Sequence, residues 1–348
     1  MEIGIDTFVD TGMAPSEAEV RGDATRVAHM LEEAELADRV GLDVYAVGEH
    51  HRPDFLASAP AILLAAIAAR TSRIRLASAV TVLSSDDPVR VFQQFATLDL
   101  ISNGRAEIIV GRGSFIESYP LFGFDLDNYD ALFSEKLDLL LKLREKTTIS
   151  WAGKHRASLS GQGVYPRPVQ NPLPVKIGVG GTPQSFVRAG LLGLPLVVAI
   201  IGGEPHRFRP LIDLYRDAGR RAGKAPEALS VAVHVHGHVG ETDQAAHASF
   251  FPVYQAGFNR IGRERGWPPV TPSQYDAQVS PLGALAAGSP ETVAAKIVRM
   301  YEALGGIDRV TMIQGSGGLP HEAALASIER LGSQVKPLVA AGIKAKLN

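Results

Sequence analysis

Cysteine is absent from the 348 residues of this sequence, which excludes disulfide bonds, thiolate nucleophiles and cysteine-ligated metal sites. Long runs of like charges are absent too, and the formal net charge is only -2. A protein that binds nucleic acid would need a basic stripe or patch. We therefore expect no nucleic-acid partner.

The sequence also has no long apolar segment. Its longest, from Ala59 to Ala69, is shorter than the roughly 20 residues of a bilayer-spanning helix and is typical of a buried helix. The first residues, MEIGIDTFVD, lack the basic region and apolar run of a signal peptide. We expect a soluble, cytoplasmic protein with no membrane partner.

What the sequence does contain is a regular alternation of short β-rich runs with helical periodicity. Each predicted strand is followed by a predicted helix, and the strands are expected at residues 2–8, 42–47, 75–83, 106–111, 175–180, 195–201, 230–239 and 308–313. Their mostly apolar, β-branched composition fits parallel strands that are buried on both faces. The pattern predicts an α/β fold, a (β/α)8 TIM barrel that forms a single domain over residues 1–348.

A doubly wound sheet is the alternative α/β fold. It would place a G-x-G-x-x-G motif after the first strand, whereas VDTGMAPSE stands there. Eight βα units close a barrel more naturally than they build such a sheet. Two segments, about 147–173 and about 267–289, are expected to be insertions in the barrel.

Glycine and polar residues follow nearly every predicted strand, as in GEHH, SSDDP, GRGS, GGTPQS and QGSGG. The carboxyl ends of barrel strands meet at one mouth, where TIM-barrel sites are built. Glycine at these positions lets the backbone approach a ligand closely. We therefore expect the functional site at this mouth.

The stretch GVGGTPQS is the clearest candidate for binding an anion. Gly180 and Gly181 free backbone N–H groups, and Thr182 with the following proline begins a helix whose N-terminus attracts negative charge. Ser185 can add a hydroxyl one turn into that helix. Arg112 lies at the end of the preceding predicted barrel strand, where its forked donors suit a phosphate.

Other interpretations of this stretch stay open. A threonine–proline pair also begins many ordinary helices, where it only caps the first turn. The glycine-rich stretch QGSGG at residues 314–318 is a competing nest for the same anion.

Histidines are the other candidates for chemistry. In VGEHHRPDF, His50 and His51 follow a predicted strand, where they either have a structural role or supply the acid–base group of a cleft. His234, His236 and His238 share one face of the seventh strand, and such a pattern also suits metal ligands. Few other His, Asp or Glu residues cluster at the mouth. We therefore interpret His234 and His236 as satisfied core histidines and expect no metal.

Taken together, these motifs resemble the bacterial-luciferase-like flavin-dependent monooxygenase family. The resemblance covers at least residues 3–201 and 288–339. The stretches that carry it, in order, are VGEHHRPDF, ASAVTVLSSDDPVRVFQQFATLDLISNGRAEIIVGRGS, LFGFDLDNY, VKIGVGGTPQS, GSPETVAAKI and LP…SIERLGSQVKPLV.

The resemblance implies a TIM-like barrel with an insertion, usually a homodimer. It implies that reduced FMN, supplied by a separate flavin reductase, binds at the mouth and reacts with O2 to give a C4a-peroxyflavin. It also implies that this species oxygenates a small organic substrate.

Site residues follow from the same resemblance, position by position. His50 matches the acid–base residue, and the Ala79–Val80 bond matches a cis peptide behind the flavin ring. Gly111 stands where the luciferase catalytic subunit has a reactive cysteine, which argues against light emission. The implied cofactor-binding residues are Ala79, Val80, Gly111, Arg112, Gly180, Gly181, Thr182 and Ser185.

Three alternative functions remain. A deazaflavin-dependent oxidoreductase would transfer hydride without O2 on the same barrel. A metal-dependent barrel hydrolase would use the histidines of the seventh strand. A flavin-binding protein would have no catalysis at all. Aromatic residues in loops 114–128 and 267–289, together with Tyr129, are expected either to shape a pocket for an apolar or planar substrate or to pack in the interior.

Overall fold

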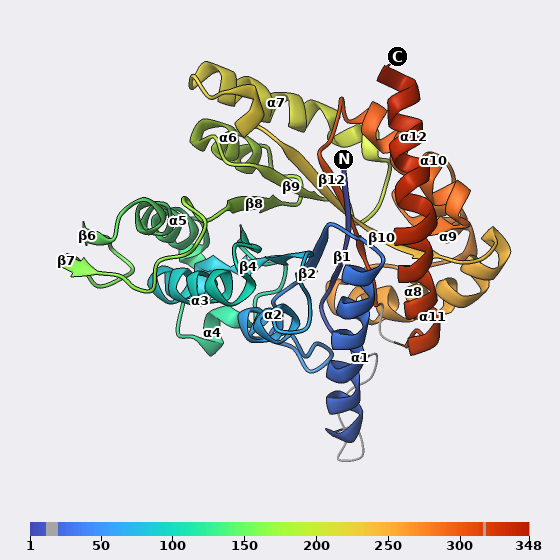
Figure 1. The fold of residues 1–348 in the computed structure, drawn as a ribbon, viewed down its shortest axis with the longest axis horizontal. Helices are drawn as coiled ribbons and strands as arrows, with labels where there is room; N and C mark the ends of the chain where they lie inside the picture. Colours follow the sequence, from blue (N-terminus) through green and yellow to red (C-terminus); the bar gives the residue numbers. More distant parts are fainter. Residues whose placement is uncertain (12–19, 316–317, 348) are drawn as a thin grey trace.

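The computed structural model describes residues 1–11, 20–315 and 318–347. Within these residues, parallel strands form a closed ring in the order β1-β2-β3-β5-β8-β9-β10-β12, and β12 pairs again with β1 (Figure 1). The ring consists of β1 (Glu2–Thr7), β2 (Val44–Val47), β3 (Arg75–Ser78), β5 (Ala106–Gly111), β8 (Val175–Val179), β9 (Leu196–Ala199), β10 (Val231–Val239) and β12 (Arg309–Ile313). The predicted TIM barrel is confirmed.

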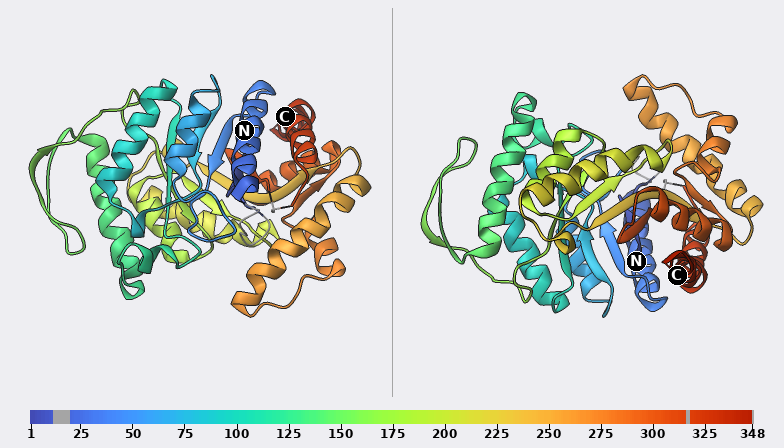
Figure 2. Two further views of the ribbon diagram at one scale, coloured as in Figure 1. Left: turned by 90° about the horizontal axis from the view of Figure 1, so that it is seen from below. Right: turned by 90° about the horizontal axis from the view of Figure 1, so that it is seen from above.

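Helices surround the strands in both views of Figure 2. The main ones are α1 (Val20–Arg39), α2 (Pro60–Ala68), α3 (Pro88–Ser102), α5 (Tyr129–Glu145), α6 (Pro183–Leu192), α7 (Arg209–Arg221), α8 (Asp243–Arg265), α10 (Pro290–Ala303), α11 (His321–Arg330) and α12 (Lys336–Leu347). Asp87 caps α3 and Ser289 caps α10 through their side-chain oxygens. Among the described helices, none combines the length and apolar character that crossing a bilayer requires.

The strand side chains divide into two apolar sets. Those that point outward, such as Ile3, Ile5 and Val310, pack against the helices in one large cluster. Those that point into the barrel are fewer and smaller, namely Val44, Ala46, Ala77, Ala79, Ile109, Val197 and Ala232. Alternate residues of a strand face opposite sides, which explains the division. The small inward side chains leave room at the carboxyl ends of the strands.

Charged residues fill the barrel at the opposite end, where the strands begin. Arg309 on β12 donates to both carboxylate oxygens of Glu107 on β5, at 2.6 and 3.1 Å. Lys176 on β8 lies 3.2 Å from Glu107, and Glu2 on β1 lies 2.6 Å from Arg309. The four residues come from four strands, so the network joins opposite sides of the barrel.

The predicted strand 75–83 is interrupted in the structure. β3 ends at Ser78, and the short β4 (Thr81–Val82) pairs with β5. The Ala79–Val80 peptide bond between them is cis, as the resemblance implied.

The two segments expected as insertions both contain regular structure. Residues 147–173 include an antiparallel hairpin of β6 (Thr148–Trp151) and β7 (Leu159–Gly163), which extends away from the barrel beside α5 (Figure 1). Residues 267–289 include α9 (Pro272–Val279) and β11 (Ala286–Gly288), and β11 pairs in parallel with the end of β10.

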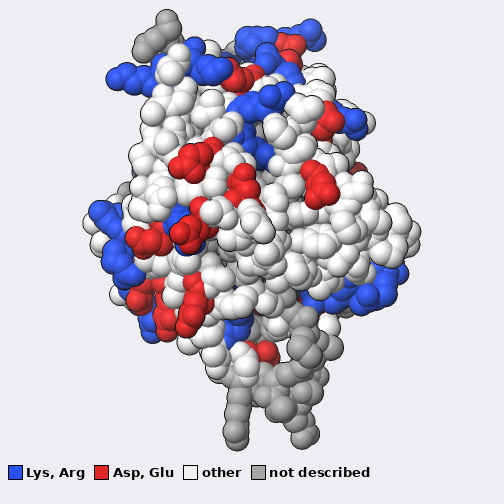
Figure 3. All heavy atoms as spheres, turned by 90° about the vertical axis from the view of Figure 1, so that its right-hand side faces the viewer, with Lys and Arg blue, Asp and Glu red and all other residues white. Residues whose placement is uncertain are grey.

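Charges of both signs are mixed on the surface. Figure 3 shows the face that carries α8 to α12, where Lys and Arg side chains lie in small groups with Asp and Glu between them. The described part of this face has no continuous basic stripe of the kind that nucleic acid needs.

Candidate active site

A cavity of about 450 Å³ opens at the carboxyl ends of the barrel strands. Its volume lies within the range of roughly 300–1,000 Å³ that is usual for small-molecule sites. All the site residues expected from the sequence line it: His50, Ala79, Val80, Gly111, Arg112, Gly180, Gly181, Thr182 and Ser185. The structure therefore brings together one candidate catalytic residue and eight candidate cofactor-binding residues; their roles remain predictions.

One side of this cavity is built from the ends of β5 and β8 and the N-terminus of α6. Thr182 is the N-cap residue of α6, but its side chain makes no capping hydrogen bond. A Cβ atom added to Gly180 would meet no atom within 4 Å, so the space beside this turn is open to a ligand. Helix N-termini bind anions through their free N–H groups and dipole, and this turn has the space for one.

Arg112 adds a positive charge on the same side. Its Nη2 donates to Ser185 Oγ over 3.2 Å, and its Nη1 lies 2.6 Å from Asp130 Oδ1. The guanidinium also stacks on Tyr129, 4.8 Å from the ring centroid. The Tyr119 hydroxyl donates to the Arg112 carbonyl over 3.1 Å. Arg112 is thus fixed between the α6 turn and a carboxylate, and fits the phosphate contact that the resemblance implied.

The side chain of Val80 forms part of the apolar lining of the cavity. A Cβ atom added to Gly111 or to Gly178 would lie 2.6 Å from a methyl group of Val80. Both glycines therefore make room for the Val80 side chain, whereas the sequence analysis expected mouth glycines to admit a ligand. Val197 and Ala199 line the same cavity, so its floor presents apolar surface to a planar ring system.

His50 lies among aromatic rings. Its ring centroid is 4.5 Å from that of Phe8, 4.6 Å from that of Phe55 and 4.8 Å from that of Phe115. Burial, together with the nearby positive charge of Arg52, lowers the pKa of His50 to about 3. The imidazole is therefore neutral at physiological pH.

The other titratable residues of the Glu-His-His motif form a structural pair. His51 Nε2 lies 2.8 Å from Glu49 Oε1, and Glu49 Oε2 accepts the backbone N–H of Val82 over 2.8 Å. Glu49 thus holds β4 against the end of β2. Of the motif, His50 and Glu49 line the cavity, and the Glu49–His51 pair also supports the cavity wall.

The sequence analysis missed a polar pair on the opposite wall. Asp6 and His234 both line the cavity, and Asp6 Oδ2 lies 2.8 Å from His234 Nδ1. The interpretation of His234 as a fully satisfied core histidine was wrong, because its Nε2 has no hydrogen-bond partner among the described residues. His236 is half-buried and its Nδ1 is also unpaired in the described structure, so the same interpretation was wrong for His236. The signal in the sequence was an aspartate facing inward at the end of the first strand.

The aromatic loops contribute less to the cavity than expected. Tyr129 lines it, and Phe115 reaches it through its contact with His50. No residue of 267–289 lines it in the described structure. The expectation that this segment shapes the pocket is corrected, because α9 and β11 pack beyond β10, at the edge of the barrel. Ser316 and Gly317 of the competing anion nest lie outside the described residues.

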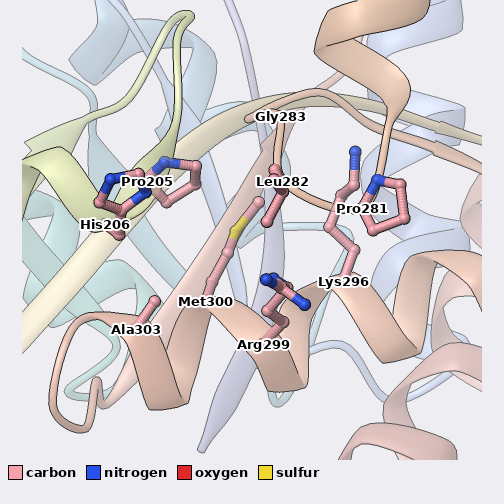
Figure 4. Close-up of a pocket in the computed structure, with 9 residues that line it drawn as sticks. All are labelled: Pro205, His206, Pro281, Leu282, Gly283, Lys296, Arg299, Met300 and Ala303. Atoms are coloured by element: carbon pink, nitrogen blue, oxygen red, sulfur yellow. The ribbon is translucent and has the colours of Figure 1, made fainter.

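Two further features of the described residues support no additional site. The described residues contain no group of three side chains that could hold a metal ion, so the histidines of β10 give no support to a metallohydrolase. A smaller cavity of about 130 Å³ lies beside α10 and is lined by Lys296 (Figure 4). Burial lowers the pKa of Lys296 to about 7, and its amine donates to the carbonyls of Gln278, Val279 and Leu285 at 2.7–3.1 Å. Lys296 therefore anchors the end of α9.

Sequence comparison relates the chain to luciferase-like monooxygenases. The family model for luciferase-like monooxygenases matches residues 1–307. An uncharacterized protein of Sinorhizobium fredii is 28% identical over 263 residues, which cover 74% of this chain and 76% of that protein. N-acetyl-S-alkylcysteine monooxygenase of Bacillus subtilis is 31% identical over 185 residues, and the match covers 52% of this chain and 53% of the enzyme.

Solved structures share the fold over nearly the whole chain. Monooxygenase RslO1 of Streptomyces bottropensis superposes with a TM-score of 0.85 at 22% identity, covering 97% of this chain and 99% of that one. The oxygenating constituent of 3,6-diketocamphane monooxygenase from Pseudomonas putida, in complex with FMN, superposes with a TM-score of 0.77 at 20% identity. The match covers 97% of this chain and 98% of that one. The F420-dependent tetrahydromethanopterin reductase of Methanopyrus kandleri superposes with a TM-score of 0.72 at 18% identity. This match also covers 97% of this chain and 98% of that one. The same fold thus accepts either cofactor.

Proposed function

The chain belongs to the luciferase-like monooxygenase family, and from this premise we propose that it uses reduced FMN and O2 to oxygenate a small organic substrate. The observation that carries the proposal is the wall where the open N-terminus of α6, Ser185 and Arg112 meet. A helix N-terminus and an arginine fork together suit a terminal phosphate. A flavin anchored there would place its ring over the cavity.

The residues around the cavity have distinct tasks in this proposal. Reduced FMN, when bound, supplies the redox chemistry with O2. Arg112 and Ser185 hold its phosphate, and Val80 supports the ring from below. The apolar walls exclude water from the reaction. Because the His50 imidazole is neutral, it can take up a proton at a ring nitrogen or donate a hydrogen bond from the other.

Cofactor titrations test the proposal directly. Oxidised FMN is added to the protein and its fluorescence is followed, and saturable binding is expected. Oxygen uptake is then measured with a flavin reductase, NADH and a panel of apolar substrates, one of which should stimulate uptake. Failure of FMN to bind overturns the proposal. Binding of reduced F420 instead, without oxygen uptake, favours the deazaflavin alternative, which has F420-dependent structural relatives.

Two partners belong to the same proposal: a separate flavin reductase and a second copy of this chain. An apolar groove runs along the outer faces of α2 and α3, lined by Ala61, Ile62, Ala65, Leu98, Ile101 and Tyr165. Ile62 is 70% exposed in the single chain, and exposed apolar patches often mark protein interfaces. Light scattering should give a molecular mass twice that of one chain. The Ile62→Glu substitution should lower this measured mass. A monomeric wild type contradicts the dimer.

A further inference from the structure

A second histidine on the cavity wall has no task in the mechanism above. His234 on β10 and Asp6 on β1 are 6% and 1% exposed, and Asp6 Oδ2 lies 2.8 Å from His234 Nδ1. In the ring of strands, β12 separates β1 from β10, and these strands stand across the barrel from β5 and β8. The pair therefore faces the anion-binding wall across the cavity.

The pairing fixes which ring nitrogen of His234 carries the proton. A carboxylate only accepts hydrogen bonds, so Nδ1–H donates to Asp6 and Nε2 keeps its lone pair. Nε2 has no partner among the described residues, and neither has Asp6 Oδ1 or the hydroxyl of Thr311, the neighbour of His234 on β12. Buried polar atoms without partners are rare in native proteins. Two of them, His234 Nε2 and Asp6 Oδ1, belong to residues that line the cavity and indicate a place where a polar group of a ligand belongs.

We propose that Asp6 and His234 are a proton-accepting pair that binds and deprotonates a phenolic or enolic hydroxyl of the substrate; the proposal rests on the flavin-dependent function above. The proton passes from the substrate oxygen to His234 Nε2. The electron pair of the broken O–H bond stays on that oxygen. The Asp6 carboxylate balances the positive charge that forms on the imidazole, as in other Asp–His pairs.

Acidity selects this class of hydroxyl. The reference pKa values of an imidazole and a phenol, about 6.5 and about 10, are close enough for proton transfer in an aligned pair. Water, which is about as weak an acid as an aliphatic alcohol, has a pKa of about 15.7 and gives up its proton to such a pair only transiently during a reaction, so it does not form the stable ion pair that a phenol can form. Phe8, Val197, Ala199 and Ile313 surround the pair in the cavity and suit a neutral, planar molecule. Deprotonation makes such a molecule richer in electrons and readier to accept oxygen.

The first test needs only the wild-type protein loaded with FMN. We compare 2-naphthol with its ether, 2-methoxynaphthalene, which keeps the ring but cannot lose a proton. We expect 2-naphthol to bind at least about tenfold tighter and to show naphtholate absorbance in the complex. Equal affinities, or a complex with neutral naphthol only, overturn the proposal. Since FMN binding is measured beforehand, its absence would contradict the proposed function instead.

Variants then assign the effect to the pair. In Asp6→Asn the amide can donate to Nδ1, so Nε2 becomes the protonated nitrogen and the acceptor is lost. We expect the tenfold preference and the naphtholate absorbance to disappear while the FMN dissociation constant changes by less than about twofold. His236→Gln is the matched control, two residues along β10 and outside the cavity lining; it should keep the preference. If Asp6→Asn keeps it too, the pair is not the acceptor.

The protonation state of the His234 imidazole can also be measured directly in the wild-type protein. This measurement tests the proposal if Asp6→Asn does not fold. In wild-type protein labelled with ¹⁵N-histidine, the resonance that disappears in His234→Gln is expected to show a protonated Nδ1 and an unprotonated Nε2. Adding 2-naphthol should move the Nε2 signal towards that of imidazolium. A protonated Nε2 before ligand addition, or no movement on addition, overturns the proposal.

Discussion

His50 illustrates how its surroundings limit what an acid–base residue can do. Three aromatic rings enclose it, and burial lowers its pKa to about 3. The neutral imidazole is therefore present throughout the pH range in which the enzyme would work. His50 brings no extra proton to the reaction, and it can hold one only transiently, because its low pKa disfavours the imidazolium form.

The first prediction concerns His50→Ala. Loss of a general acid–base group lowers rates by roughly 10²–10⁴-fold, and we expect substrate-stimulated oxygen uptake to fall within that range. FMN affinity should change by less than about twofold, because His50 lies away from the α6 turn. The pH profile of the wild type between 5 and 8 should contain no step from His50. His206→Ala, on the surface, is the control, and unchanged turnover in His50→Ala contradicts the role.

The second prediction separates the phosphate contact from the rest of the flavin. Hydrogen bonds to charged groups contribute about 1.5–3 kcal/mol, so Arg112→Ala should weaken FMN binding by roughly 10–150-fold. Riboflavin lacks the phosphate, so its affinity should change little. Both dissociation constants follow from fluorescence titration, with Arg263→Ala on the exposed end of α8 as the control. An equal loss of affinity for FMN and for riboflavin would mean that Arg112 contacts the flavin ring and not the phosphate.

The third prediction concerns the carboxylate beside Arg112. Asp130 is exposed and lies 2.6 Å from the guanidinium, where it competes with an incoming phosphate. Exposed ion pairs contribute about 0.2–1 kcal/mol, so Asp130→Asn should tighten FMN binding up to about fivefold. The gain should shrink at high salt, which screens exposed charges. Weaker FMN binding in Asp130→Asn would mean that Asp130 orients Arg112 instead of competing for it.

At the scale of single residues, the sequence located one half of the cavity and missed the other. Arg112, Gly180 and Ser185 lie in short motifs whose local chemistry already points to an anion. Asp6 and His234 are 228 positions apart, and although His234 belongs to the alternating histidines of the seventh strand, no motif links it to Asp6. Only the closure of the barrel places them 2.8 Å from each other, so residue types and spacing could not reveal the pair.

Three strands meet under Val80, and their contact decides the shape of the cavity floor. Val80 precedes β4, Gly111 ends β5 and Gly178 lies on β8. A Cβ atom at Gly178 would come within 2.6 Å of one Val80 methyl group, and its other neighbours are at 3.6 Å. A methyl group added at Gly178 should therefore disturb its packing against Val80. Shortening the Val80 side chain should relieve the disturbance.

The fourth prediction is a double-mutant cycle on this contact. Overpacking costs about 1–3 kcal/mol, so Gly178→Ala should lower the free energy of unfolding by that amount and weaken FMN binding. Val80→Ala alone removes buried methyl groups and should also destabilise the protein. Val80→Ala makes space for the new Cβ atom at residue 178. The double variant should therefore lose less free energy of unfolding than the two single variants lose together. Urea unfolding measures all three, and strict additivity would contradict the contact.

At the scale of elements, local pattern predicted the barrel strands well and irregular features poorly. The predicted strand 75–83 looked continuous because its residues are mostly apolar, yet its pairing with β5 is interrupted around the cis peptide Ala79–Val80. The β6–β7 hairpin was not predicted as strands, because β7 is mostly exposed and shows no alternation of buried and exposed residues. Caps such as Asp87 were predictable, since the capping atoms are neighbours in the sequence.

For the molecule as a whole, the repeated βα alternation was enough to predict a closed barrel, because each unit carries its own signal. What holds the ring together at its amino end could not be predicted. Glu107 and Arg309 lie 202 positions apart, and each is a single charge in an otherwise apolar strand. Their pairing across the barrel interior is a consequence of closure, and it makes the stability of the whole fold sensitive to acid.

The last prediction concerns that sensitivity. Burial alone would raise the pKa of Glu107, but Arg309 and Lys176 lower it to about 2. The unfolded chain has a glutamate pKa of about 4.3, so Glu107 contributes its full stabilisation above that pH and loses it as the pH falls towards 2. Wild-type protein should therefore lose about 3 kcal/mol of unfolding free energy from this residue across the window, at roughly 1.4 kcal/mol per pH unit.

Glu107→Gln removes this dependence together with the pairing. It leaves Lys176 without its carboxylate and Arg309 with Glu2 alone, and breaking a buried ion pair costs about 3–5 kcal/mol, so that loss is expected at pH 7. The variant should then lose less further stability than wild type between pH 4.3 and 2. Urea unfolding across this range gives both quantities. Glu302→Gln, which removes the exposed partner of Lys346, is the control and should cost under about 1 kcal/mol at pH 7. If both variants behave alike, the charged end of the barrel is no more than a solvated surface.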